Sequence, residues 1–358
     1  MINDQPTEIR GVRAIMSGRC RGPGASCMRA AAWLASKPYA LVMRLRRWGY
    51  RRGVLGSHKA PVPVISVGNV TTGGTGKTPM VAWAVRLLAE AGRSPAIVTR
   101  GYKAVRTQEG AAPRSDEAEL LSELTGSPVI VEPDRVAGAR RAAEQGAGVV
   151  VLDDAFQHRR IRRDADIVLI DAAEPFGLGH CLPRGLLREP PAALKDADAV
   201  VITHADEVSS ERLVELRRRL AALCRPGTPV AEAAHKPVAA IDEKGQRHPP
   251  DALAGRAVLE FCGLGNPEHF GKSLDGVGAR TVAIVRMGDH AAYRQETLAD
   301  LAELARREGA EIMVTTQKDH VRLAHLSPPP GAPIWQLAIE IEVTSGREEL
   351  VSKIMGAL

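Results

Sequence analysis

Cysteine is scarce in this chain of 358 residues, and its five copies are scattered along the sequence. No Cys-x-x-Cys pair occurs, and no group of cysteines and histidines has the spacing of a zinc site. An odd number of dispersed cysteines argues against a disulfide framework and indicates reduced, structural thiols in a cytosolic setting. The residues concerned are Cys20, Cys27, Cys181, Cys224 and Cys262.

Long apolar runs are also lacking. No stretch reaches the roughly 20 uninterrupted apolar residues of a membrane-spanning helix. The nearest candidate, residues 30–43, is interrupted by Lys37 and Pro38. Residues 1–27 begin with acidic residues and have no clean apolar core, which argues against a signal peptide and predicts a disordered tail.

A modest excess of basic residues gives the chain a net charge of +6 and a pI of about 9.2. Such a balance suits acidic partners such as nucleotides, anionic lipids or nucleic acids, although basic residues are often only solvated surface. Much of the excess lies in residues 1–60. The charge alone therefore does not select one partner.

Residues 28–55 combine aromatic and basic side chains, including two of the four tryptophans and two of the four tyrosines. Aromatic rings suit a lipid–water boundary and arginines attract anionic headgroups, so an interfacial helix is one interpretation. The other is a helix packed on the protein body with its basic face in water, and the pattern alone does not decide between them. The basic residues are Arg44, Arg46, Arg47, Arg51 and Arg52.

From residue 56 onward, short apolar runs alternate with amphipathic segments. Continuous apolar runs are typical of parallel strands covered by helices on both faces, so residues 56–230 are predicted to form a doubly wound, mostly parallel α/β core. The expected strands are 63–67, 96–99, 128–131, 149–152, 167–170 and 199–203, and the expected helices are 77–91, 117–124 and 135–145.

The pattern loosens around residues 226–256, which we interpret as a join between two lobes. Residues 231–358 are expected to form a second, smaller α/β lobe that closes over the active-site cleft. Its expected strands are 258–262, 281–285, 312–315 and 333–341, with a helix over 296–307.

The strongest chemical signal is GNVTTGGTGKT at residues 68–78, which follows an apolar strand and opens a helix. Glycines allow backbone N–H groups to surround phosphate oxygens, and the helix N-terminus adds positive potential. Lys77 is expected to reach the β- and γ-phosphates and Thr78 to supply a hydroxyl to Mg²⁺. The usual pattern has glycine where this chain has Thr71. The predicted nucleotide-binding residues are Thr71, Thr72, Gly73, Gly74, Thr75, Gly76, Lys77 and Thr78.

A second signal is VVVLDD at residues 149–154, an apolar strand that ends in two acids. Downstream of a P-loop this arrangement predicts that Asp153 and Asp154 hold Mg²⁺ directly or through water.

The roles of the remaining acids are ambiguous. Asp116 and Glu117 open a helix, where a carboxylate is often only a cap, and Asp289–His290 suits any loop.

Several blocks together resemble the lipid A 4'-kinases, the tetraacyldisaccharide 4'-kinase family. They occur in the family's order and cover roughly residues 28–355. The blocks are PVPVISVGNVTTGGTGKTP (61–79), TRGY (99–102), SDE (115–117), LDDAFQHRRIRRD (152–164), LPRGLLREP (182–190), FCGLGNPEHF (261–270), GDH (288–290) and TTQKDHVRL (315–323).

The resemblance implies a Mg²⁺-dependent reaction in which the γ-phosphate of ATP moves to the 4'-hydroxyl of a tetraacylated disaccharide 1-phosphate. It implies two α/β lobes, a lipid substrate, and work at the cytoplasmic face of the bacterial inner membrane. It also favours the membrane-associated reading of residues 28–55. Neither a nucleic acid nor a protein partner is implied.

The resemblance also implies roles for individual residues. Asp116 would be the base that activates the sugar hydroxyl and His290 its partner, and Tyr102 would contact the nucleotide. Substrate or phosphate contacts would come from Arg188, Glu189 and Glu117. The chain departs from the family pattern at Ser115 and Ala118 (SDEA for GDEP), at Ala155 (LDDA for LDDG), and in LPRGLLREP for LPAGPLREP, which puts the loop geometry in question but keeps the acids.

Two other readings remain open on the sequence. One is a P-loop kinase or synthetase that acts on a soluble small molecule. The other is a P-loop switch ATPase, which would assemble with a partner in a nucleotide-dependent manner and form no phosphorylated product.

Overall fold

The computed structural model describes residues 12–101, 115–288, 293–331 and 333–358. The chain divides into two compact units. One unit, which we call the P-loop unit, comprises Gly11–Ala234 and Ile341–Leu358. The other, the inserted unit, comprises His235–Glu340. Each is described by itself.

The P-loop unit is built on a parallel sheet in the order β7-β6-β5-β1-β4-β2-β3. The central strand β1 pairs with β4 on one side (Ile65 with Val151) and with β5 on the other (Ile65 with Ala165). Its strands are β1 Val64–Asn69, β2 Pro95–Thr99, β3 Val129–Val131, β4 Val149–Asp153, β5 Ala165–Asp171, β6 Ala199–Thr203 and the first part of β7 Val230–Ile241.

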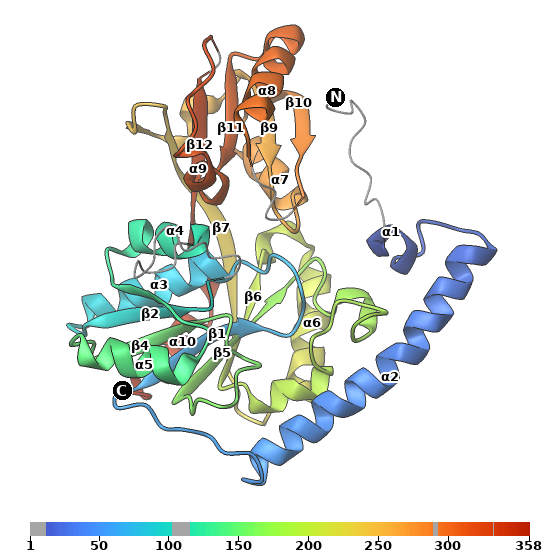
Figure 1. Ribbon diagram of the computed structural model, residues 1–358, viewed down its shortest axis with the longest axis vertical. Helices are drawn as coiled ribbons and strands as arrows, with labels where there is room; N and C mark the ends of the chain where they lie inside the picture. The colour runs from blue at the N-terminus through green and yellow to red at the C-terminus, as the bar shows by residue number, and fades with distance from the viewer. Residues whose placement is uncertain (1–11, 102–114, 289–292, 332) are drawn as a thin grey trace. The chain divides into compact units, whose positions relative to one another are not determined.

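Helices cover both faces of this sheet (Figure 1). On one face the core includes Val81 and Val85 of α3 Lys77–Glu90, Leu121 of α4 Asp116–Thr125, and Leu350 and Ile354 of α10 Arg347–Met355. On the other face α5 Arg135–Glu144 and α6 Ser210–Leu223 pack against separate apolar clusters. Strands buried on both sides explain the continuous apolar runs, and the predicted doubly wound sheet is confirmed.

The inserted unit carries β8 Arg247–His248, β9 Ala257–Cys262, β10 Arg280–Arg286, β11 Ile312–Thr316 and most of β12 Ile334–Ser345. Its strand order is β10-β9-β11-β12-β7, with β8 antiparallel to β7. Helix α8 Gln295–Glu308 packs on one side of its core, and α7 Glu268–Gly276 on the other, while α9 Gln317–Leu323 follows β11. The predicted second, smaller α/β lobe is therefore present.

Two boundaries differ from the expectation. The stretch interpreted as a join contains the 12-residue strand β7, which was missed because its alanines alternate irregularly with His235, Lys236 and Pro237. Residues 341–358 were assigned to the second lobe, but they belong to the P-loop unit, since α10 buries Leu350 and Ile354 in its core.

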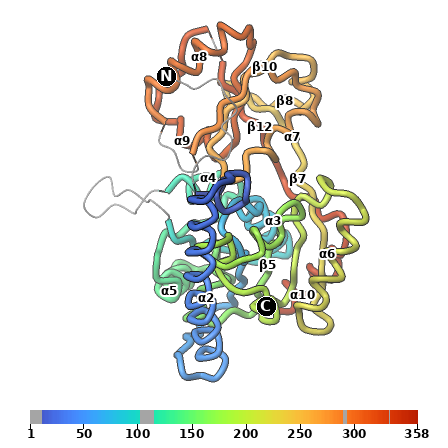
Figure 2. Tube along the Cα trace, turned by 90° about the vertical axis from the view of Figure 1, so that its right-hand side faces the viewer, coloured from blue at the N-terminus to red at the C-terminus, as the bar shows by residue number. Residues whose placement is uncertain are grey.

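The N-terminal region is more ordered than the predicted tail. A short helix α1 spans Val12–Met16, and the long helix α2 begins at Pro23, inside the segment expected to be disordered, and ends at Arg51. Arg13 of α1 pairs with Glu174 at 2.6 Å, and Arg184 donates to the carbonyl of Met16. These contacts come from residues far along the chain, so the local sequence does not reveal them. In both views α2 lies on the outside of the P-loop unit (Figures 1 and 2). None of the helices in the described ranges is long and apolar enough to span a bilayer.

Candidate phosphate-binding site

The loop between β1 and α3 has the backbone expected of a phosphate cradle. Gly76 precedes α3 in the left-handed region with φ 73°, and Gly73 has φ 129°, conformations that suit glycine. A Cβ added at Gly73 would meet nothing within 4 Å, so this part of the loop is open. No side chain caps the first turn of α3, which leaves its N–H groups available to an anion.

Buried polar contacts hold the loop from behind. Asn69 Nδ2 donates to Thr75 Oγ1 at 2.9 Å, and Thr203 Oγ1 donates to the carbonyl oxygen of Thr75 at 3.2 Å. These contacts fix Thr75 within the loop, and its role in nucleotide binding stays a prediction. Thr72 and Thr78 are partly exposed on the loop and at the start of α3.

The segment LPRGLLREP pairs with the loop along its backbone. Thr72 N donates to the carbonyl of Leu186 at 2.7 Å, and Arg188 N donates to the carbonyl of Val70 at 2.8 Å. Thr71 forms the antiparallel bridge with Leu187 between these bonds and is not among the residues with positive φ. Threonine is thus compatible with the position where other P-loops have glycine, because the backbone here is paired rather than turned.

The two acids after β4 occupy different environments. Arg188 Nη1 donates to both carboxylate oxygens of Asp154, at 2.8 and 2.9 Å, and Lys77 Nζ lies 3.9 Å from Oδ1 of the same residue. Burial raises the pKa of Asp154, but the charges of Lys77 and Arg188 outweigh it and bring the pKa below its usual value. Asp154 is an ionised acceptor beside the P-loop, and it adopts φ 49°, an unusual conformation for a residue other than glycine.

Asp153 lies deeper. Its side chain is buried and accepts a hydrogen bond from Thr99 Oγ1 at 3.2 Å. Burial, followed by the carboxylates of Glu117 and Asp154, raises the pKa of Asp153 to about 6. The same interaction places Glu117 near this acid pair. Two carboxylates and the Thr78 hydroxyl form the hard oxygen set that Mg²⁺ prefers, so the residues present fit this metal.

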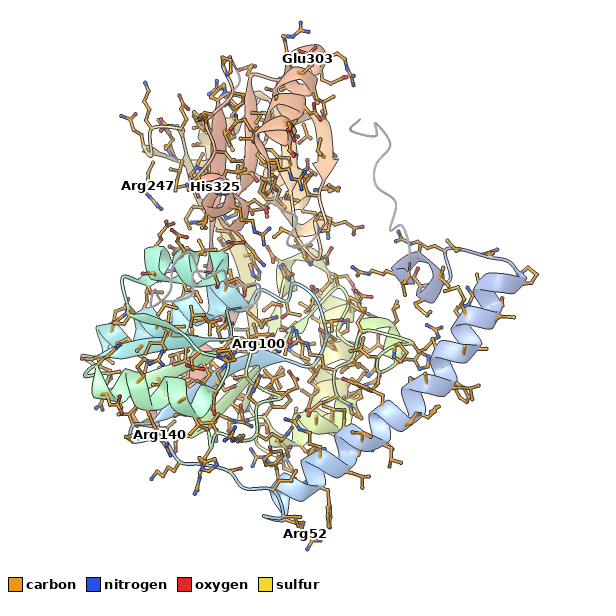
Figure 3. The ribbon with its side chains drawn as sticks, viewed as in Figure 1. Arg52, Arg100, Arg140, Arg247, Glu303 and His325 are labelled. Atoms are coloured by element: carbon orange, nitrogen blue, oxygen red, sulfur yellow. The ribbon has the colours of Figure 1, made fainter. Side chains whose placement is uncertain are left out.

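Sequence reasoning missed two polar residues of the site. Arg135, at the start of α5, is buried and donates to the carbonyl oxygens of Glu132 and Asp153, at 2.8 and 3.2 Å. Gln157 donates from Nε2 to the carbonyl of Asn69 at 2.8 Å and accepts from Arg188 at 3.4 Å. The block LDDAFQH contains Gln157 at a helical-turn spacing after Asp153 and Asp154, which was the only available signal. Arg100, labelled in Figure 3, follows β2 and acts electrostatically on Arg135.

The remaining predicted residues divide into three groups. Asp116 is exposed in the first turn of α4, which Ser115 caps by accepting from Ala118 N. Glu189 is 1% exposed and pairs with Arg159 at 3.1 Å, and its contact with substrate or phosphate stays a prediction. Tyr102 and His290 lie outside the described residues, and their roles stay predictions.

Comparisons with known proteins agree on one family. A family model for tetraacyldisaccharide-1-P 4'-kinase matches residues 28–357. The tetraacyldisaccharide 4'-kinase of Anaeromyxobacter dehalogenans (strain 2CP-C) is 38% identical, over 96% of this chain and 94% of that protein. The one from Halothermothrix orenii is 34% identical, over 85% of this chain and 86% of that protein.

A solved structure is also similar over most of the chain. The crystal structure of LpxK from Aquifex aeolicus in complex with ATP has a TM-score of 0.72 and 28% sequence identity, and the match covers 92% of this chain and 99% of that chain. The family model and the solved structure both match nearly the whole chain. The chain therefore belongs to the tetraacyldisaccharide-1-P 4'-kinase family.

Proposed function

We propose that this protein transfers the γ-phosphate of ATP to the 4'-hydroxyl of tetraacyldisaccharide 1-phosphate, a step in lipid A formation. Membership of the family supports the substrate. The observation that carries the chemistry is the convergence of Lys77 and Arg188 on Asp154, next to an open P-loop. Two cations and an acid at this point match what phosphoryl transfer requires of a protein, which is positioning and charge stabilisation.

Each group has a role that follows from its place. The N–H groups of residues 73–78 bind the β- and γ-phosphates, and Lys77 neutralises charge that develops as the bond to the leaving oxygen breaks. Thr78, Asp153 and Asp154 would hold Mg²⁺, which when bound would neutralise phosphate charge. Arg188, held by Asp154, is oriented toward the same phosphates. Asp154 would therefore serve both as a metal ligand and as the residue that positions Lys77 and Arg188.

Acceptor activation is proposed for Asp116, with His290 as its partner. Asp116 takes the proton of the 4'-hydroxyl while the oxygen forms its bond to the γ-phosphorus and the bond to ADP breaks. Its exposure at the first turn of α4 supports access by a large acceptor. Asp116→Ala is expected to lower kcat far more than the affinity for ATP. An equal loss in both would identify a binding role instead.

The outer side of α2 supports a peripheral association with the cytoplasmic face of the membrane. Leu34, Leu41, Leu45 and Trp48 are 54–64% exposed and recur at spacings of seven, four and three residues, which aligns them on one helix face. Arg52, just past the helix end, extends away from the unit (Figure 3). An apolar stripe flanked by arginines is typical of a helix lying in a lipid interface.

The function is tested by following labelled γ-phosphate from ATP–Mg²⁺ in neutral-detergent micelles. One reaction contains tetraacyldisaccharide 1-phosphate and a parallel reaction contains the same sugar without acyl chains. Label in the lipid alone, lost in Lys77→Ala, is the expected result. Label in the non-acylated sugar would favour a soluble acceptor, and ATP binding without any labelled acceptor would favour a switch ATPase.

The membrane role is tested separately by sedimentation with vesicles containing anionic lipid. Replacing Leu34, Leu41 and Leu45 with glutamine is expected to reduce the vesicle-bound fraction about tenfold or more, since each buried leucine contributes about 1.5–3 kcal/mol. Unchanged sedimentation of this variant would contradict the interfacial role of α2.

A further inference from the structure

Helix α2 has a second, inward side whose polar residues contact the phosphate-binding site. Tyr39 and Ala40 pack on the apolar cluster beneath β5 and β6, and Ser36 is 4% exposed. Tyr39 and Arg46, seven residues apart, lie on the helix face opposite Leu34, Leu41 and Leu45, and Arg47 borders that face. The proposed membrane binding by Leu34, Leu41 and Leu45 does not depend on these inward contacts.

The first contact ends at the residue that holds Asp154. Tyr39 Oη donates to the carbonyl oxygen of Arg188 at 2.9 Å. The other two polar groups of Arg188 are also engaged, its N–H with Val70 of the P-loop strand end and its guanidinium with Asp154. Burial, with smaller contributions from Cys181 and Glu189, raises the pKa of Tyr39, so its hydroxyl remains a donor at neutral pH.

The second contact ends at the neighbouring loop. Arg46 Nη2 donates to the carbonyl oxygen of Gln157 at 3.0 Å. The side chain of Gln157 in turn donates to the carbonyl of Asn69 and accepts from Arg188. Both contacts of α2 thus reach backbone atoms of residues whose side chains contact each other and whose neighbours form the P-loop.

A third contact supports the first two. Arg47 donates to both oxygens of Asp196, at 2.6 and 3.0 Å, and Asp196 also accepts from Arg159, which pairs with Glu189. These side chains are 15% exposed or less, so the pairs are shielded from solvent. The segment that carries Arg188 is therefore held to α2 at Arg188 itself and again at Asp196.

We propose that Tyr39 and Arg46 are positioning residues for phosphoryl transfer, which hold Arg188 and Gln157 in the arrangement that orients Asp154 and Lys77. The inference rests on the proposed roles of Asp154 and Arg188. Its physical basis is that a misplacement of about 1 Å in a group that acts on a phosphoryl centre lowers the rate by as much as a hundredfold. The helix proposed to bind the membrane is, on this view, also a part of the catalytic scaffold.

The test compares Tyr39→Phe with Tyr50→Phe in neutral-detergent micelles, where membrane binding is not limiting. Tyr50 lies on the same helix, and the guanidinium carbon of Arg46 lies 5.6 Å from the centroid of its ring. Phenylalanine preserves this ring. Tyr39→Phe is expected to lower kcat about three- to tenfold, which corresponds to one lost hydrogen bond, with the KM values for ATP and lipid within twofold of wild type. Tyr50→Phe is expected to retain wild-type kcat. Wild-type kcat in Tyr39→Phe would overturn the proposal, as would an equal fall in both variants.

A double-mutant cycle establishes whether Tyr39 acts through Arg188. In an Arg188→Lys background the effect of Tyr39→Phe should fall to less than twofold, because the guanidinium that Tyr39 positions is absent. Single-turnover transfer of labelled γ-phosphate closes the same cycle if steady-state turnover of the double variant is too slow to measure. Additive losses would overturn the positioning role. Wild-type kcat in Arg188→Lys alone would instead overturn the role assigned to Arg188, so the two failures are distinguishable.

Discussion

Gly68, near the end of β1, marks a close approach between the P-loop strand and the loop that carries the acid pair. A Cβ built on Gly68 would lie 2.8 Å from both the amide nitrogen and the Cβ of Phe156. Phe156 is fully buried and Arg159 stacks over its ring with the guanidinium carbon 5.4 Å from the centroid. The amide nitrogen and the Cβ of Phe156 cannot move aside as the end of a flexible side chain could, so a methyl group at Gly68 requires a backbone shift.

We therefore expect Gly68→Ala to lower the free energy of unfolding by about 1–3 kcal/mol and to lower kcat, because the shift separates the P-loop from the acids. Urea unfolding and the micelle assay measure the two effects. Gly24→Ala is the matched control, since a Cβ at Gly24 would meet nothing within 4 Å. Wild-type stability of Gly68→Ala would show that the two loops separate without cost.

Asp153 and Asp154 are adjacent, yet their environments push their pKa values in opposite directions. Burial raises the pKa of both carboxyl groups, but Lys77 and Arg188 outweigh it at Asp154, whereas Glu117 and Asp154 add to it at Asp153. Asp154→Asn is expected to lower kcat about 10²–10³-fold, as for the loss of one preorganised electrostatic contact, and to raise the Mg²⁺ concentration for half-maximal rate. Glu119→Gln, an exposed change on α4, is the control. An unchanged Mg²⁺ dependence would remove Asp154 from the metal site.

At the scale of elements, α2 combines an apolar face with a buried ionic one. Burial tends to raise the pKa of Asp196, but hydrogen bonds from Arg47 and the charge of Arg159 bring it below the ordinary value of 3.8. Because the pKa of Asp196 is lower in the folded than in the unfolded chain, its ionised carboxylate stabilises the fold at pH values above the unfolded pKa. This stabilisation is lost as the pH falls through the folded-state pKa. The attachment of α2 is therefore expected to weaken only in acid below about pH 4.

Arg47→Leu tests this attachment. Because the variant removes two hydrogen bonds to a largely buried carboxylate, it should lower the free energy of unfolding at neutral pH by about 1–3 kcal/mol. The difference from wild type should shrink as the pH falls below 3.8, where Asp196 in the unfolded chain becomes protonated. Arg51→Leu, an exposed change at the end of the same helix, is the control. Chemical denaturation across this pH range provides the measurement, and a constant difference would contradict the ionic origin.

At the scale of the whole molecule, the chain leaves the P-loop unit along β7 and returns along β12. The returning segment completes the core of the P-loop unit, where Leu350 and Ile354 of α10 share a cluster with Met80, Val81 and Val85 of α3. Because α3 begins with Lys77, the end of the chain supports the helix that carries the phosphate-binding lysine.

Leu350→Ala is accordingly expected to lower the free energy of unfolding by about 2–5 kcal/mol, and ATP should partly offset this loss by binding the folded state. Thermal unfolding with and without ATP–Mg²⁺ measures both effects. Glu349→Ala, an exposed neighbour on α10, should remain close to wild type. A small effect of Leu350→Ala would mean that α10 is dispensable to the P-loop unit.

Local patterns in the sequence sufficed for most of the parallel strands, the P-loop, the acid pair and the family. Strand β6 begins and ends at the predicted residues, and α3 begins at the predicted Lys77, because apolar runs and glycine spacing report local backbone preferences. Strand β7 was missed because its apolar residues are mostly alanines interrupted by polar ones, which carry little periodic signal.

The tertiary structure decided which polar groups meet. Tyr39 and Arg188 are 149 residues apart in sequence and share a hydrogen bond, and Arg159 forms a buried ion pair with Glu189, which lies 30 residues away. The opposite pKa shifts of Asp153 and Asp154 likewise depend on Glu117, Lys77 and Arg188, which fold around them from other elements. Spacing along the chain encodes which residues are available for chemistry, whereas burial and neighbouring charge, which exist only in the folded chain, set what each of them does.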